Sequence, residues 1–165
     1  MGTAQSFTQT SYSSFLQGGN FTSQTKLFKG EKKMRNLSIP TNKIPQSTIA
    51  SATQISDIAL DNAYGYGLST DTESFGYQAN KLSATFALCA IVGNNERDIE
   101  VIANAVHDGW SFAAYNVYDP RYETQPQKKI NRIALADTLY SDLDEGEKEK
   151  DRVIARAILA YATQL

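Results

Sequence analysis

The residue types that most often carry chemistry are scarce in this chain. It has one histidine, His107, and one cysteine, Cys89. A zinc site usually draws four ligands from Cys, His and acidic side chains, and a nucleophilic site pairs Ser or Cys with His. No second histidine, nearby cysteine or paired acid accompanies His107 in the sequence. We therefore interpret His107 as a hydrogen-bonded structural residue.

Sequence patterns for phosphate binding, acyl transfer or calcium binding are also missing. Gly65-Tyr66-Gly67 lacks the further glycine and the lysine of a phosphate loop, and there is no Gly-x-Ser-x-Gly elbow. Asp142, Asp144 and Glu145 are clustered, but they lack calcium-loop spacing, and acids are favoured at the start of a helix. We predict a protein that is not an enzyme and has neither a metal nor a cofactor.

Apolar side chains recur at helical spacing after residue 50, which predicts a mainly α fold. The run from Asn80 to Val92 has two apolar faces, so we expect a buried helix that Asn80 caps and Gly93 stops. So short a run could also be a strand. Asp144 and Glu147 have capping-box spacing and predict the start of the last helix. The expected helices cover 52–63, 80–92, 95–115 and the chain from about 144, with a short irregular or hairpin excursion over 116–130.

Residues 1–50 differ in composition from the rest of the chain. Ser, Thr, Gln and Asn occupy 22 of these 50 positions, and six basic side chains stand against one acid, whereas residues 51–165 hold 10 basic and 17 acidic side chains. So polar a segment buries too little apolar surface to offset, by itself, the entropy that it loses on ordering. A basic arm can, however, bind the acidic body of a neighbouring copy. We predict an extended arm with interface residues Phe7, Tyr12, Phe15, Phe21, Phe28, Lys32, Lys33 and Arg35.

The remaining composition limits the cellular setting. The net charge of −2 by itself implies no nucleic-acid partner. No apolar run approaches the length of a membrane span, and the polar N-terminus lacks the pattern of a secretory signal. A single cysteine fits a reducing compartment. We expect a protein that is not secreted, has no membrane partner and does not read nucleic acid directly.

Two motifs follow one another in the second half of the chain. The first is IANAVHDGW over residues 102–110, in which Trp110 follows His107 by three positions. The second is LYSDL over residues 139–143, followed by EKEKDR over residues 147–152. Together they resemble the RyR domain of ryanodine receptors and of their bacterial and phage relatives, over roughly residues 96–162.

The resemblance implies a small helical body and divides the chain into three parts. These are the arm over 1–50, a helical and loop extension over 51–95 that packs on the body, and the RyR-like domain over 96–165. The family usually has a His-Pro step before its second motif, where this chain reads KINRIA. Trp110 stands on the apolar stripe and should be buried in the core. Asp151 and Arg152 could pair with the helix that carries His107, and so fix the angle between the two helices, or they could cap the excursion.

Two functions follow from the arm and from the resemblance. We favour a non-enzymatic structural subunit of a homo-oligomeric assembly, whose partners are copies of itself and other assembly proteins. Because RyR-like domains occur in phage-encoded proteins, the resemblance implies a capsid or head-associated protein in a virion or the host cytoplasm. The alternative is a sensor or regulatory module for a nucleotide-type ligand. Its site would lie between the motif helices and the excursion and would use His107, Trp110, Tyr115, Tyr118, Arg121, Tyr140 and Arg152.

Overall fold

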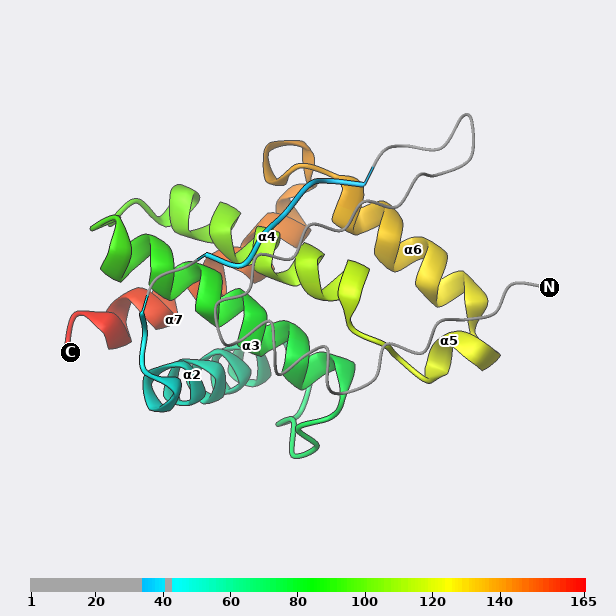
Figure 1. Cartoon of the computed structure of the whole chain (residues 1–165), viewed down its shortest axis with the longest axis horizontal. Helices are drawn as coiled ribbons and strands as arrows, with labels where there is room; N and C mark the ends of the chain where they lie inside the picture. Colours follow the sequence, from blue (N-terminus) through cyan, green and yellow to red (C-terminus); the bar gives the residue numbers. More distant parts are fainter. Residues whose placement is uncertain (1–33, 41–42) are drawn as a thin grey trace.

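The computed structural model describes residues 34–40 and 43–165, and within these residues it contains helices and no strand (Figure 1). The mainly α fold predicted from the sequence is therefore confirmed. The helices are α2 (Gln46–Tyr64), α3 (Phe75–Leu88), α4 (Ile99–Asn116), α5 (Arg121–Thr124), α6 (Pro126–Asp137) and α7 (Glu145–Ala162), with a π-helical turn over Cys89–Gly93 and a 3-10 turn over Tyr140–Asp142. None of these helices is both long and apolar enough to cross a membrane.

Helices α3 and α4 lie side by side at the centre of the described part, and α2 and α7 pack against them (Figure 1). Two clusters of buried apolar side chains result. One cluster fills the space between α2, α3, α4 and α7, and Leu88, Val106 and Ile158 are among its fully buried members. The other joins α3 and α4 to α6 and includes Leu82 and Phe112. The four longest helices therefore share one continuous scaffold.

Gly109 lets α3 and α4 approach closely. A Cβ atom added at Gly109 would lie 2.5 Å from the carbonyl oxygen of Leu82 and 2.8 Å from the Cα of Ser83. Because both neighbours are backbone atoms, no side-chain rotation can relieve the contact. A glycine at this point is a packing requirement of the helix crossing.

Three predicted boundaries are wrong at their N-terminal ends. The helix predicted over 95–115 begins at Ile99, because Asp98 is its N-cap and accepts a hydrogen bond from the Glu100 N–H. Helix α3 begins at Phe75, and its N-cap is Ser74, six residues before the predicted cap Asn80. The Ser74 hydroxyl accepts a hydrogen bond from the backbone N–H of Tyr77 at 3.2 Å. Ser is as good a cap as Asn, and the buried side chain of Phe75 extends the apolar face to this earlier start. Helix α2 begins at Gln46 rather than at 52, so it starts inside the predicted arm.

The predicted excursion over 116–130 is helical rather than a hairpin. Its prolines begin helices instead of breaking them, because Pro120 precedes α5 and Pro126 is the first residue of α6. Backbone N–H groups in the first helical turn have no partner within the helix, so a proline there loses no hydrogen bond, and its φ is already helical. At the start of α7 the prediction is confirmed, since the Asp144 carboxylate accepts a hydrogen bond from the Glu147 N–H at 2.9 Å.

Part of the predicted arm lies on the chain's own body. Residues 34–40 run across α4, where Ile39 is buried in the second apolar cluster (Figure 1). The Arg35 guanidinium pairs with Asp108 and donates to the Ser111 hydroxyl at 3.3 Å. Arg35, predicted as an interface residue, therefore contacts α4 of the same chain. The other predicted interface residues lie outside the described residues: Phe7, Tyr12, Phe15, Phe21, Phe28, Lys32 and Lys33.

Candidate functional site

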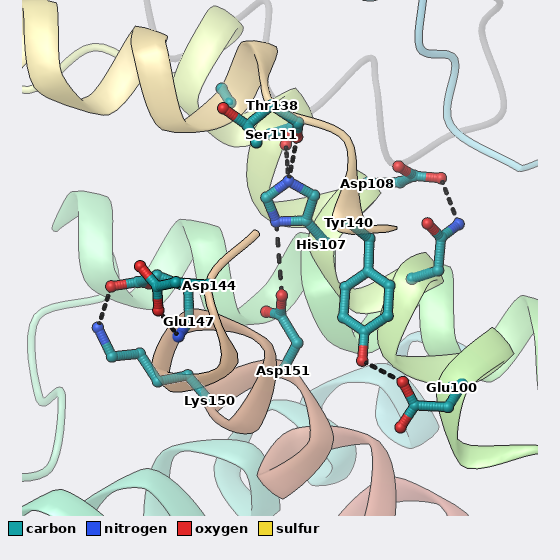
Figure 2. A network of polar contacts seen from close by, with 12 residues as sticks. Glu100, His107, Asp108, Ser111, Thr138, Tyr140, Asp144, Glu147, Lys150 and Asp151 are labelled. Carbon is teal, nitrogen blue, oxygen red and sulfur yellow. Dashed lines mark hydrogen bonds and ion pairs between the residues drawn. The ribbon is translucent and has the colours of Figure 1, made fainter. Parts of the chain in front are cut away.

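His107 of α4 and Asp151 of α7 meet in the interior, so the two sequence motifs contact each other (Figure 2). His107 is 2% exposed. Its Nε2 atom lies 2.8 Å from the carbonyl oxygen of Thr138, and its Nδ1 atom lies 3.4 Å from Asp151 Oδ2. The imidazole thus links α4 to the turn after α6 on one side and to α7 on the other. The expectation that Asp151 pairs with the helix that carries His107 is confirmed.

The contacts of His107 determine where its protons lie. A carbonyl oxygen only accepts, so Nε2 carries a hydrogen and donates it to Thr138. The contact between Nδ1 and Asp151 is attractive only if a proton lies between them, on either partner. Burial raises the pKa of the Asp151 carboxyl, and its hydrogen bond with His107 partly offsets that effect. The pair therefore shares one proton in a poorly hydrated setting.

Ser111 lies beside this pair but is not placed as a nucleophile. Its hydroxyl oxygen is 3.5 Å from His107 Nε2 and is completely buried. Because Nε2 already carries a hydrogen, it cannot take a proton from Ser111. The hydroxyl instead accepts a hydrogen bond from Arg35 at 3.3 Å. Ser111, His107 and Asp151 therefore lie in a row of structural contacts.

A second bridge joins the same two helices nearer the surface. Arg152 of α7 donates to Glu100 of α4 at 2.7 Å. Figure 2 shows that the Tyr140 hydroxyl donates to the same carboxylate, at 2.9 Å. The hydrogen bond from Arg152 lowers the pKa of Glu100, and burial together with the Glu100 contact raises the pKa of Tyr140 to about 12. The expectation that Arg152 pairs with α4 is confirmed.

A cavity of about 580 Å³ opens beside the His107–Asp151 pair. Helices α2, α3, α4 and α7 surround it, together with the loop that follows α2. Its polar lining includes Asp57, Asn80, His107, Glu147, Lys150 and Asp151. Its apolar lining includes Leu60, Leu68, Phe75, Trp110, Leu135 and Ile154. A concave, mainly apolar wall with a few polar groups is typical of a small-molecule site.

The loop after α2 forms one wall of the cavity and is held by acids of that helix. The backbone N–H of Gly67 donates to Asp61 at 2.8 Å, and that of Ser69 donates to Asp57 at 2.6 Å. Gly67 has a φ of 80°, a conformation that side chains disfavour. The exposed rings of Tyr64 and Tyr66 stack with centroids 5.3 Å apart. These contacts therefore fix the conformation of the loop at the cavity.

Negative charge prevails in the cavity lining. Asp57, Glu147 and Asp151 face it, and Lys150 is its one lysine. The Lys150 ammonium lies 2.6 Å from Glu147, so its charge is largely neutralised locally (Figure 2). Asp57 is engaged by Ser69 and by the amide of Asn80 at 3.1 Å. A phosphate or carboxylate would therefore meet an unfavourable potential in this cavity.

The structure brings together only some of the residues predicted to bind a ligand. His107 and Trp110 line the cavity, and their rings stack with centroids 6.1 Å apart. Trp110 is half-buried, because the cavity borders a ring that we expected to be enclosed in the core. Tyr140 and Arg152 belong to the Glu100 bridge. Neither these two nor Tyr115, Tyr118 and Arg121 line the cavity.

Those remaining three residues make other contacts. The Tyr115 hydroxyl donates to Asp137 at 2.7 Å, and burial, together with that contact, raises the pKa of Tyr115. Tyr118 pairs with Glu123 at the exposed end of α5. Arg121 forms an ion pair with Asp119 at 2.7 Å. The arginine that we expected to meet a phosphate is thus occupied by an internal carboxylate.

Asp119 anchors the end of α4 to α5 and α6. Its side chain is 2% exposed and lies 2.8 Å from Arg132, in addition to Arg121. Burial disfavours the carboxylate, but the hydrogen bonds from the two arginines outweigh it and hold the pKa of Asp119 well below its usual range. The Arg132 guanidinium stacks 3.5 Å from the centroid of Phe75, one of the cavity residues. This cluster supports the cavity wall from behind.

Sequence reasoning missed Asp57, Asn80 and Lys150 as cavity residues. Each is a polar residue on a helix, a pattern that ordinarily indicates a solvated face. The available signal was the Tyr64-Gly65-Tyr66-Gly67 segment, which composition marks as a loop with exposed aromatics. In the described part of the chain, no group of three His, Cys, Asp or Glu side chains is placed to hold a metal ion.

The chain matches no family model, no curated protein and no solved structure in the comparisons with known proteins. The resemblance to the RyR domain therefore stays a prediction from the two motifs.

Proposed function

We propose that this chain is a small-molecule-binding module whose ligand occupies the cavity beside His107 and Asp151. The observation that carries the proposal is the cavity of about 580 Å³, which is lined by the buried His107–Asp151 pair and by the only tryptophan of the chain. Its volume lies within the roughly 300–1,000 Å³ that small-molecule sites usually have. A buried ionisable pair in a concave site is a common feature of binding sites.

The character of the lining limits the ligand. Apolar walls at Leu60, Phe75 and Ile154 suit a flat or aliphatic body. The acids at Asp57 and Asp151 disfavour phosphates, which counts against the nucleotide-type ligand that the RyR resemblance implies. We therefore infer an uncharged or cationic organic molecule. A sensor or regulatory role, as in the RyR-like modules that the motifs resemble, would follow from binding of this kind.

The experiment follows the indole N–H signal of Trp110 in ¹H–¹⁵N spectra while small aromatic and aliphatic fragments are added. Because the chain has one tryptophan and Trp110 borders the cavity, this one signal reports occupancy. We expect saturable shifts with several fragments. Gly76→Phe should remove them, because Gly76 lies on the cavity wall and has open space for a side chain. Gly76→Ala is the matched control and should retain them; shifts that persist equally in both variants would place binding elsewhere.

A structural subunit of a homo-oligomeric assembly is the second candidate. One observation favours it, the basic excess of residues 1–50 over an acidic body. The ion pair of Arg35 with Asp108 lies within one chain. Copies of the chain, within a virion, would be the partners. The full-length chain and its Lys32→Glu/Lys33→Glu variant should differ in mass by light scattering. Equal masses at low and physiological salt would contradict an assembly role for these lysines.

A further inference from the structure

The largely buried carboxylate of Asp151 accepts few hydrogen bonds from the described residues. Its side chain is 13% exposed and lies on the cavity wall. Within the described part of the chain, its one polar contact is with His107 Nδ1 at 3.4 Å, longer than an ordinary N–H···O hydrogen bond of about 2.7–3.2 Å. A carboxylate can accept about four hydrogen bonds. Most of the acceptor capacity of Asp151 is therefore unused by the described residues.

Apart from the proton that it shares with His107, Asp151 has no compensating cation among the groups around it. From α4 it faces His107, which is also held by Thr138. From its own helix it faces Glu147 and Lys150, which neutralise each other at 2.6 Å. Helix α2 adds the further acid Asp57, and α3 adds polar but uncharged residues. The cavity thus presents a poorly solvated carboxylate with unfilled acceptor positions.

We propose that the ligand of this cavity carries a cationic amine or amidine that donates hydrogen bonds to the Asp151 carboxylate. The inference rests on the proposed binding function and names the chemical class of the ligand. An ammonium or amidinium head would fill the acceptor positions of Asp151 and offset the negative lining. The apolar remainder would lie against Trp110 and Ile154, where an aromatic ring can also stack. Binding would convert a poorly paired buried carboxylate into a charge-assisted pair.

The test compares three probes of one shape: benzylammonium, benzyl alcohol and benzoate, each titrated against the full-length protein at neutral pH. The Trp110 indole signal is the readout. Benzylammonium should bind about tenfold or more tightly than benzyl alcohol, because hydrogen bonds to charged groups are the stronger ones. Benzoate should bind most weakly. If benzyl alcohol binds as tightly as benzylammonium, or benzoate more tightly, the amine assignment fails while the binding function stands. If no probe of any charge moves the signal, the binding function fails as well.

Asp151→Asn separates ligand recognition from a purely structural role. The asparagine amide can donate to His107 Nδ1, so the helix contact is kept while the negative charge is removed. We expect the variant to bind benzylammonium and benzyl alcohol about equally. Glu149→Gln is the matched control, because Glu149 is on the same helix and outside the cavity lining. It should keep the preference; its loss in both variants would indicate long-range charge rather than contact.

The unmodified protein gives a third readout that does not depend on a variant. Lowering the pH protonates Asp151, and the benzylammonium affinity should fall while the benzyl alcohol affinity stays constant. Asp57, His107, Glu147 and Lys150 also line the cavity. The same titration of Asp151→Asn is therefore the control, and in that variant the fall in benzylammonium affinity should be absent. Constant benzylammonium affinity down to the acid limit of folding would overturn the proposal.

Discussion

Replacing Gly109 with alanine should open the crossing of α3 and α4, on which both apolar clusters depend. The added Cβ would lie 2.5 Å from the Leu82 carbonyl oxygen, whereas ordinary contact begins at 3.4 Å. The helices must therefore separate locally by up to about 0.9 Å. A gap of about 0.5–1 Å removes roughly a quarter to a half of the attraction between neighbouring atoms.

The expected cost is the difference between two terms. Overpacking of a well-filled core typically costs about 1–3 kcal/mol, and a backbone-to-backbone clash belongs at the upper end of that range. Alanine gains about 0.5–1 kcal/mol over glycine inside a helix. We expect the free energy of unfolding to fall by about 2 kcal/mol. Because the urea dependence of small proteins is about 1–3 kcal/mol per molar, the urea midpoint should fall by about 1 M.

Urea unfolding followed by circular dichroism measures this change, and Trp110 fluorescence beside the substituted position gives an independent probe. Gly76→Ala is the matched control, since Gly76 is in α3 and nothing lies within 4 Å of an added Cβ. It should leave stability unchanged or raise it by up to about 1 kcal/mol. Equal stabilities of Gly109→Ala and Gly76→Ala would refute the close crossing.

Three further substitutions test the polar contacts. Asp119→Asn should lower the free energy of unfolding by about 3 kcal/mol, because it leaves Arg132 and Arg121 without their buried partner. In the unmodified protein, the folded pKa of Asp119 is lowered, so its stabilisation should be complete above pH 3.8 and decline as the pH falls below that value. For Asp151 the pH dependence of stability has the opposite sign. Because its folded pKa is raised, its contribution to stability in the unmodified protein is lost as the pH rises above 3.8 towards neutral. Asp151→Asn should flatten this dependence, which thermal unfolding across that pH range measures. Tyr140→Phe should cost about 1 kcal/mol by chemical denaturation, through loss of the hydrogen bond to Glu100. An unchanged free energy of unfolding in Asp119→Asn or Tyr140→Phe, or an unchanged pH dependence of stability in Asp151→Asn, would contradict the contact concerned.

The helices themselves could be predicted from the sequence, because their apolar faces repeat at helical spacing. The start of α7 was predictable since Asp144 and Glu147 have a spacing with a direct structural meaning. The earlier start of α3 at Ser74 was not, because Ser74 and Asn80 are both acceptable caps and only the burial of Phe75 separates them. The helices α5 and α6 were missed because proline is compatible with both a turn and the first turn of a helix.

The candidate site was predictable only where its residues belong to a motif. His107 and Trp110 drew attention as the single examples of their types. Asp57 and Lys150 could not be found in this way, because surface-type residues become cavity residues only through the packing of α2 against α7. The pairing of Asp151 with His107 was inferable as a helix contact, but the cavity beside it depends on the loop after α2, whose shape no local pattern specifies.

Native mass spectrometry of the gently purified full-length protein, with Gly76→Phe beside it, tests the binding function most directly. We predict that the unmodified chain retains a non-covalent adduct of a few hundred daltons, which denaturation releases and which Gly76→Phe lacks. A bare chain mass in every state of assembly, or the same adduct at the same occupancy in both proteins, would contradict ligand binding in this cavity.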